Sequence, residues 1–309
     1  MILCIGTTPA AQRVMMFSKL VPDSVNRAAR TLDGSAGKSV NVAKVLKALG
    51  EQPIATGFLG GRRGEEIHAD LVARAIQMEF LTVSAGTRQC ISVINESDHT
   101  ITELVEESHA VPESEYHRLI EIVRRRLADC RIVVMSGSLT PGGSVEFYQR
   151  CTQFAREAGV LSVIDAQGPP LMHALKAGPG LVKPNRAELA ATVAGELKTE
   201  SALISAMQEL RRRGAERVVV TAGKEPTLAF DGQTAWKVCP PAIIPVNPIG
   251  SGDSFTAALA WRLAQGENLG EACRWGAAAG AANALTPMPG DLNRRDVERL
   301  VSEVKIERL

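Results

Sequence analysis

The sequence lacks both a strong net charge and a long apolar segment. Its 309 residues carry a formal charge of only +1 at pH 7, with 35 Lys and Arg against 34 Asp and Glu. Such a chain has no global field that would attract nucleic acid or acidic membranes, so neither is an expected partner. No run approaches the roughly 18 apolar residues that a membrane span needs, and the apolar start at residues 1–6 is far too short for a signal peptide. We therefore expect a cytoplasmic protein whose partners bind at local sites.

Paired cysteines and paired metal ligands are also missing. The six cysteines lie far apart without a C-x-x-C pair, and none of the five histidines stands at metal-ligand spacing from another histidine or a cysteine. Several cysteines lie within apolar runs, which favours buried free thiols over disulfides or a zinc site. A chain of this length can bury a large core without cross-links. Since we find no repeat or linker, we expect one elaborated domain over residues 1–309.

Short apolar runs alternate with segments of helical spacing along most of the chain. Strands are predicted at 3–6, 53–58, 132–135, 161–164 and 217–221, and helices at 40–49, 145–157, 202–213, 253–264, 270–285 and 294–304, so that the chain is almost entirely helical from residue 252 onward. This alternation is typical of an α/β protein with a parallel sheet and helices on both faces. Residues 8–34 show no strong period, whereas residues 87–108 are predicted to form a hairpin. These two segments could form a small sheet of their own.

Two glycine-rich segments resemble nucleotide-binding motifs but fail their tests. Gly34–Ser39 looks like a P-loop, yet the pattern needs a glycine five residues before Gly37, where this chain has Leu32. Gly250-x-Gly252 starts a dinucleotide fingerprint, but Phe255 replaces its third glycine, and the segment lies near the end of the chain. We therefore exclude a P-loop and a nicotinamide cofactor.

What remains at Gly250–Gly252 is a turn of small residues that leads into a predicted helix, with Asp253 in its first turn. Free N–H groups and the positive end of a helix can hold an anion there, and a carboxylate can accept a proton from a hydroxyl beside that anion. Phosphoryl transfer to an alcohol needs both functions. An Asp at this position more often caps the helix start, and the turn alone favours that interpretation.

Five segments rich in glycine and polar residues follow one another along the chain. They are Gly37–Gly50 with Gly57–Gly60, Ser136–Leu139, Lys183–Leu189, Thr221–Gly223 and Asn247–Phe255. In this order they resemble the signatures of the PfkB (ribokinase-like) carbohydrate kinases, over nearly the whole chain. The resemblance implies a doubly wound, mainly parallel α/β core with a small β lid formed by segments near 8–34 and 87–108. It also implies ATP and Mg²⁺ as cofactors and a homodimer that pairs through the lid.

The resemblance assigns roles to residues of the last three segments. Asp253 becomes the base that deprotonates the acceptor hydroxyl, and Gly250, Ser251 and Gly252 present N–H donors to the transferring phosphoryl group. The implied nucleotide-binding residues are Lys183, Asn185, Glu188, Thr221, Gly223 and Asn283, of which Asn185 and Glu188 would also hold magnesium through water. The alternatives are a capping box for Asn185 and Glu188, an exposed lysine at 183, a plain strand-ending turn at 221–223 and close helix packing around Asn283.

The sugar-binding residues that the resemblance implies lie in the first half of the chain: Gln12, Gly37, Lys38, Asn41, Arg88 and Ser138. Lys38 and Arg88 match the branch of 1-phosphofructokinases and tagatose-6-phosphate kinases, and two cations suit an acceptor that already carries a phosphate. Ordinary solvated charge is the alternative for either residue. Gln12 replaces an aspartate that is usual in that branch, which leaves the sugar open. Pro226 replaces a usual glycine and Asn247 a usual aspartate on the nucleotide side.

These patterns support three hypotheses. The first is transfer of the ATP γ-phosphate to a phosphoketose, with fructose 1-phosphate the first expectation and tagatose 6-phosphate the second. The second is a kinase for an unphosphorylated sugar or nucleoside. The third, motivated by Gln12 and Pro226, is a sensor that binds sugar phosphate or nucleotide without efficient catalysis, and the intact Gly250–Asp253 segment argues against it.

Overall fold

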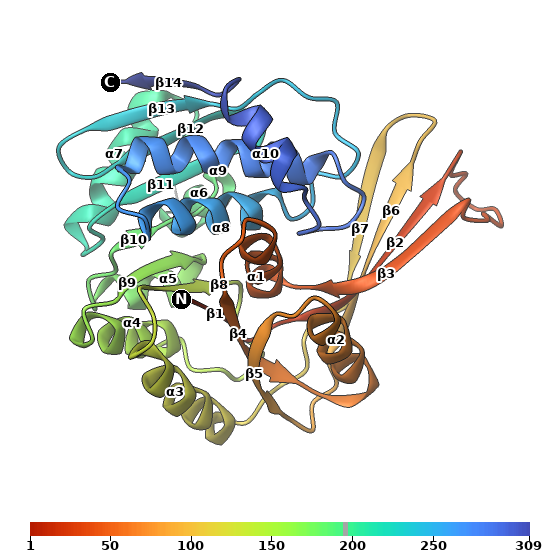
Figure 1. The fold of residues 1–309 in the computed structure, drawn as a ribbon, viewed down its shortest axis with the longest axis horizontal. Coiled ribbons are helices and arrows are strands. Elements are labelled where there is room, and N and C mark those ends of the chain that lie inside the picture. Colours follow the sequence, from red (N-terminus) through yellow and green to blue (C-terminus); the bar gives the residue numbers. More distant parts are fainter. Residues whose placement is uncertain (194–196) are drawn as a thin grey trace.

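A computed structural model describes residues 1–193 and 197–309 and contains two sheets of different size (Figure 1). The large sheet has ten strands in the order β14-β13-β12-β11-β10-β9-β8-β1-β4-β5. Its strands are β1 (Ile2–Gly6), β4 (Pro53–Leu59), β5 (Gln77–Thr82), β8 (Ile132–Ser136), β9 (Leu161–Asp165), β10 (Leu181–Val182), β11 (Val218–Ala222), β12 (Glu225–Phe230), β13 (Ala235–Cys239) and β14 (Lys305–Arg308). Neighbouring strands from β5 to β11 are parallel, whereas β12, β13 and β14 are added antiparallel. The sheet is mainly parallel, as predicted.

Helices cover both faces of the large sheet because its central strands are apolar on both sides. The helices are α1 (Lys38–Ala48), α2 (Gly61–Ala73), α3 (Glu113–Leu127), α4 (Phe147–Glu157), α5 (Gly168–Leu175), α6 (Arg186–Val193), α7 (Glu200–Arg212), α8 (Ser251–Leu263), α9 (Leu269–Ala284) and α10 (Arg294–Val301). In β1, Ile2 and Cys4 belong to the core under α1, α8 and α9, while Leu3 and Ile5 belong to the core under α3 and α4. This alternation follows because successive side chains of a strand point to opposite faces. The predicted α/β architecture is confirmed.

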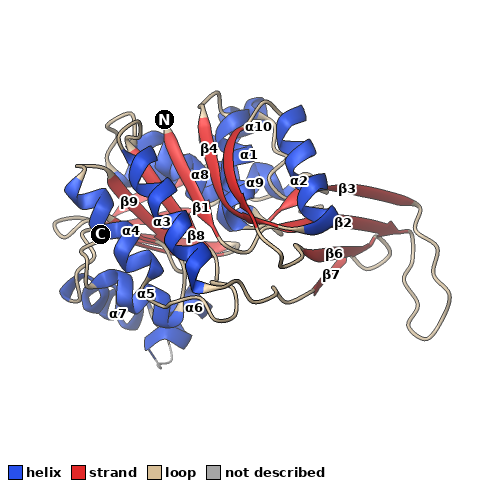
Figure 2. Cartoon of the chain, turned by 90° about the horizontal axis from the view of Figure 1, so that it is seen from below, coloured by secondary structure: helices blue, strands red, loops and turns tan. Residues whose placement is uncertain are grey.

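A second sheet, the lid sheet, projects from this body (Figure 2). It has four strands in the order β3-β2-β6-β7, namely β2 (Ala10–Phe17), β3 (Arg30–Ala36), β6 (Arg88–Asn95) and β7 (Thr100–Val105). Gln12 of β2 pairs with Gly34 of β3. Two residues on, Val14 packs with Ile94 and with Met288 from the loop after α9. One face of the lid sheet, the face that carries Gln12, is therefore turned toward that loop.

Several sequence predictions of local structure need correction. Residues 8–34, where no period was found, contain β2 and most of β3, which share a sheet with the hairpin predicted at 87–108. β2 has no clear alternation because both of its faces carry buried side chains, for example Ala11 and Gln12. The end of the chain is not entirely helical, since Lys305–Arg308 pair with β13 as β14. A short, charged strand at a sheet edge has no apolar pattern by which it could be predicted. None of the helices in the described part of the chain is long and apolar enough to cross a membrane.

Candidate active site

The turn before α8 holds Gly250 in a conformation that favours glycine. Its φ is +84°, and a Cβ on it would lie only 2.9 Å from the Cβ of Pro289. Side chains other than hydrogen are strained at such a φ. The turn therefore brings the backbone close to the loop that contains Pro289. At the positive end of α8 the Ser251 N–H donates to Pro248 O at 3.1 Å, while the N–H groups of Gly250 and Gly252 have no acceptor in the described part of the chain.

Asp253 lies in the first turn of α8 and is only 7% exposed. Its Oδ2 accepts a hydrogen bond from Asn41 Nδ2 at 2.8 Å. No backbone N–H of the helix start donates to this carboxylate among the described residues, so Asp253 is not a hydrogen-bonded helix cap. The oxygen of the same amide, Asn41 Oδ1, is buried without a partner in the described part of the chain. A buried acceptor beside a buried carboxylate is suited to receive a hydroxyl group.

Asp165 is a functional candidate that the sequence analysis missed. It ends β9, is 1% exposed, and its carboxylate contacts Lys38 Nζ at 2.9 Å, Lys183 Nζ at 3.0 Å and Thr256 Oγ1 at 2.7 Å. Burial alone would raise the pKa of Asp165, but Lys183 and Lys38 hold it well below its usual range. Its position directly after the predicted strand 161–164, at the carboxyl edge of a parallel sheet, is the signal that could have identified it.

Burial is the main reason why the pKa of Asp253 lies near neutrality. Burial raises the pKa of Asp253 to about 7; Asp165 also raises it, and Lys38, Asn41 and Lys183 oppose the rise. Burial lowers the pKa of Lys38, but Asp165, Asp253 and Glu188 outweigh it and keep this lysine charged. A carboxylate with such a pKa can accept a proton from a hydroxyl and release it again near neutral pH.

Lys38 also connects this centre to the start of α6. Its Nζ lies 3.1 Å from Glu188 Oε1, while Glu188 Oε2 accepts from the Asn185 N–H at 2.8 Å and Asn185 Oδ1 accepts from the Glu188 N–H at 2.8 Å. The capping box considered as an alternative is therefore present. The exposed-lysine alternative for Lys183 is wrong, since that residue is 2% exposed and paired with Asp165.

A cavity of about 1190 Å³ opens beside these groups. Its apolar wall comes from the loop before α8 and from α9, with Pro240, Ile243, Ala277 and Ala281 among its residues. Its polar end is lined by Asn185, Thr221, Gly223, Ser251 and Gly252. The volume and the apolar wall suit a nucleotide base, and the N–H groups of the α8 start suit its phosphates.

The side-chain oxygens at the polar end of the cavity fit a magnesium ion only together with water and phosphate oxygens. In the described part of the chain no group of three or more His, Cys, Asp or Glu side chains could hold a metal by itself. Asn185 and Glu188 are engaged with each other, although their oxygens retain lone pairs. They fit an ion that keeps most of its waters and takes its remaining ligands from a triphosphate, as magnesium commonly does.

The side chain of Asn283, which the sequence analysis assigns to the nucleotide, makes its hydrogen bonds to the turn before α8 and to the loop after α9. Its side chain is fully buried; Nδ2 donates to Ile249 O at 2.9 Å and Oδ1 accepts from the Gly290 N–H at 2.7 Å. Since both ends of the amide are satisfied by backbone, they hold the turn before α8 against the loop after α9 and do not face the base cavity. Asn247, which stands where an aspartate is usual, also bonds to backbone: its side chain donates to Pro287 O at 2.8 Å.

The residues expected to bind the sugar gather where the lid sheet meets the body. Gln12 is buried and donates to Ser92 Oγ at 2.9 Å. Arg88 donates to Thr8 O at 3.2 Å, and the Thr8 hydroxyl reaches Ser138 O at 3.4 Å. The Nε of Arg88 is buried and has no partner among the described residues. Arg88 therefore keeps a free donor for an anion.

Comparison with known proteins agrees with this geometry. The model of the pfkB family carbohydrate kinases matches residues 1–293. The tagatose-6-phosphate kinase of Staphylococcus epidermidis is 29% identical over 309 residues, which cover 99% of each chain. The structure of Escherichia coli phosphofructokinase-2 in complex with fructose-6-phosphate is 29% identical, with a TM-score of 0.87 over 97% of this chain and 98% of that one. A Thermotoga maritima protein named a possible 1-phosphofructokinase has a TM-score of 0.92 over 100% and 99%, and at 23% identity it shows the fold alone.

Proposed function

Because this chain belongs to the pfkB family of carbohydrate kinases and is an ATP-dependent sugar kinase, we propose that Asp253 is its general base and that a phosphorylated ketose is its acceptor. The observation that carries the proposal is the buried Asp253: burial raises its pKa to about 7, and beside it Asn41 Oδ1 and the Gly252 N–H have no hydrogen-bond partner in the described part of the chain.

In the proposed reaction, Asp253 accepts the proton of the acceptor hydroxyl while the hydroxyl oxygen bonds to the γ-phosphorus of ATP. The bond from that phosphorus to the β,γ-bridging oxygen breaks, and ADP leaves. Gly250 and Gly252 offer N–H groups to the charge on the transferring group, whereas the Ser251 N–H donates to Pro248 O at 3.1 Å. Asn41 holds the carboxylate through its Nδ2 and accepts from the sugar through its Oδ1.

The nucleotide would lie in the 1190 Å³ cavity, with its base on the apolar wall and its phosphates at Thr221, Gly223 and the start of α8. Asn185 and Glu188 would hold the waters of magnesium, which when bound neutralises charge on the triphosphate. Lys183 would act on the phosphates through its charge from beneath the site, because its buried ammonium is paired with Asp165. We assign Asn283 to the support of the turn and not to the nucleotide.

The identity of the acceptor is the more specific part of the proposal. Arg88, with its unpartnered Nε, supports an acceptor that already carries a phosphate. The sequence analysis ranks fructose 1-phosphate first and tagatose 6-phosphate second. The Staphylococcus epidermidis tagatose-6-phosphate kinase supports the second candidate, so both belong in one test.

The test is a steady-state assay of ATP consumption with fructose 1-phosphate, tagatose 6-phosphate, fructose 6-phosphate and free sugars. We expect the highest kcat/KM with one of the sugar phosphates. Turnover confined to free sugars or nucleosides would reject the phosphoketose acceptor. Binding of a sugar phosphate in calorimetry without any turnover would favour the sensor.

We also propose that two copies pair through their lid sheets. β7 is an edge strand of that sheet, and its Leu104 and Val105 are 54% and 48% exposed. Apolar side chains on an open edge are a surface that a second copy can cover. Light scattering after gel filtration should show a dimer that Leu104→Lys shifts toward monomer; a monomeric wild type at micromolar concentration would reject the pairing.

A further inference from the structure

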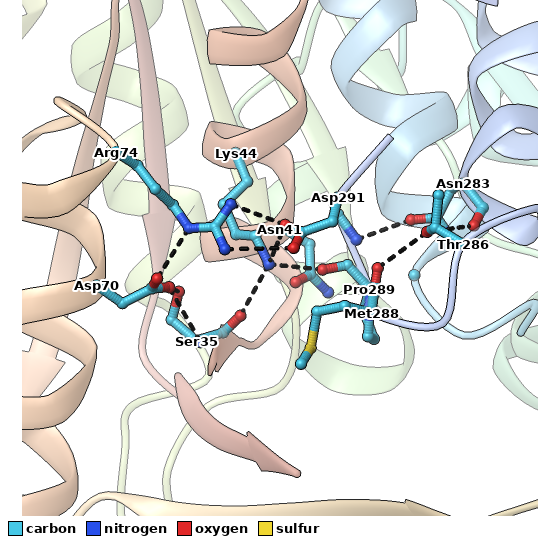
Figure 3. Close-up of polar contacts among 12 residues, drawn as sticks. Ser35, Asn41, Lys44, Asp70, Arg74, Asn283, Thr286, Met288, Pro289 and Asp291 are labelled. Carbon is cyan, nitrogen blue, oxygen red and sulfur yellow. Dashed lines mark hydrogen bonds and ion pairs between the residues drawn. The ribbon is translucent and has the colours of Figure 1, made fainter. Parts of the chain in front are cut away.

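Lys44 is a buried cation on α1 that the proposed chemistry does not use. It is 3% exposed, and its ammonium group lies between Ser35, Pro289 and Asp291 (Figure 3). Its Nζ lies 3.1 Å from Ser35 O, 2.7 Å from Pro289 O and 3.0 Å from Asp291 Oδ1. An ammonium group has three N–H donors, so these three acceptors use its full capacity.

The acceptors of Lys44 belong to two separate segments. Ser35 lies at the base of β3, where the lid sheet joins the body, and Pro289 and Asp291 lie in the loop after α9. Arg74 of α2 closes the network, since it binds Asp291 at 2.8 Å and Asp70 at 2.9 Å. Asp70 in turn accepts from the N–H and hydroxyl of Ser35. The charges alternate along the network, so the buried Lys44 and the partly exposed Asp291, Arg74 and Asp70 each have a partner of opposite sign.

The loop held by Lys44 also contacts the proposed catalytic residues. Pro289 packs against Gly250 so closely that a Cβ there would lie 2.9 Å from its ring. A Cβ on Gly290 would lie 3.2 Å from the Cα of Asn41, whose amide binds Asp253. Asn283 fastens the same loop to the turn through Gly290 N and Ile249 O. Through this loop Lys44 is connected on one side to the lid sheet and on the other to the phosphoryl-binding turn.

We propose that Lys44 is a positioning residue that fixes the base of the lid sheet and the Gly250–Asp253 turn relative to one another, so that a sugar held under the lid is aligned with Asp253. This role rests on the proposed function, in which the lid residues Gln12 and Arg88 hold the acceptor. Misplacement of reacting groups by about 1 Å can cost roughly a hundredfold in rate, so a small shift of either segment should lower turnover.

The experiment compares Lys44→Met with Lys47→Met, a control on the same helix whose ammonium reaches only Gln52 at the surface among the described residues. The acceptor is whichever member of the sugar panel the wild type phosphorylates. We expect Lys44→Met to lower kcat by roughly tenfold to a hundredfold, with the KM for ATP within about twofold of wild type. Rates are normalised to the folded fraction, measured by circular dichroism below the unfolding transition. Lys47→Met should keep wild-type kcat.

Amide hydrogen exchange gives a second readout that does not depend on the sugar. In Lys44→Met we expect faster exchange at Ser35 and in the 250–253 turn, and unchanged exchange in the central strand β1. If Lys44→Met does not fold, Asp291→Asn is measured instead, because it keeps the size and one acceptor while it removes the charge. Wild-type kcat or wild-type exchange at both segments in the folded variant would overturn the proposal. If the wild type phosphorylates no sugar, the proposed function is rejected. The role of Lys44 in positioning the two segments would then be tested by amide hydrogen exchange alone.

Discussion

Asp253→Asn should lower activity and raise stability, and the two effects have one cause. If Asp253 is the general base, its loss removes proton transfer in the transition state, which is worth roughly 10² to 10⁴ in kcat. Asparagine keeps the shape of the side chain and can still accept from Asn41 Nδ2 through its oxygen. What it removes is a buried negative charge that the folded protein ionises with difficulty.

The size of the stability gain follows from the pKa of Asp253, which burial raises from 3.8 to about 7. At about 1.4 kcal/mol for each pKa unit, the ionised carboxylate costs the folded state about 4 kcal/mol. Because the pKa is raised on folding, this cost is absent below about pH 4, grows as the pH rises and is complete above about pH 7. The gain of Asp253→Asn in free energy of unfolding should therefore be about 2 kcal/mol larger at pH 8 than at pH 5.5.

Two assays test this account. Urea unfolding of wild type and variant at pH 5.5 and 8 measures the stability gain, and kcat/KM of the wild type against pH should rise through about pH 7 as Asp253 ionises. A variant with near-normal kcat would refute the base. An equal stability gain at both pH values would refute the raised pKa, whatever happens to the rate.

Three further predictions concern the surroundings of Asp253. Arg88→Ala should raise the KM for a phosphorylated acceptor about tenfold or more with little change for free sugars, because a charge-assisted contact is lost; an unchanged KM would exclude Arg88 from phosphate binding. Asp165→Asn should move the acid limb of kcat/KM below pH 7, because Asp165 raises the pKa of Asp253, and should cost about 3–5 kcal/mol in urea unfolding as a buried pair is broken. Gly250→Ala should cost about 1–3 kcal/mol since its φ is +84°, whereas Gly252→Ala, with no atom within 4 Å of the added Cβ, should cost less; equal losses would argue against strain at the turn.

The fold was predictable wherever local pattern and burial agree. The predicted strands 132–135 and 161–164 are β8 and β9, and their β-branched apolar residues are buried on both faces. Helices α8 and α9 begin and end within two residues of their predictions. The antiparallel extension by β12, β13 and β14 was not predicted, because these strands carry no clear apolar period and are stabilised by pairing with their neighbours in the sheet, of which only β14 lies at the edge.

The same limit applies to the site. Asp253 could be found because a glycine turn and a helix start leave a local signature. Lys44 has no such signature, since its significance comes from distant partners such as Pro289. For Asp165 the only local signal is its place directly after a predicted strand, and its contact with Thr256 could not be foreseen. Asn283 was found by resemblance but placed at the nucleotide, and only its hydrogen bonds to backbone on both sides assign it to the turn. Long-range contacts between polar groups decide these roles, and sequence spacing does not encode them.

The two cations that suggested a phosphorylated acceptor are not equivalent in the folded protein. Lys38 is held by Asp165 at 2.9 Å and by Glu188 at 3.1 Å, so its charge is already compensated and it bears on the pKa of Asp253. A phosphate that recruited Lys38 would have to compete with two carboxylates. Arg88 pairs with a backbone carbonyl and keeps a buried Nε without a partner in the described part of the chain, so binding an anion would relieve a desolvation cost there. For the proposed phosphorylated acceptor, we therefore expect Arg88 to bind the phosphate and Lys38 to serve the transfer step. Lys38→Met should then lower kcat far more than it raises the KM for the sugar phosphate, and the reverse ratio would return Lys38 to substrate binding.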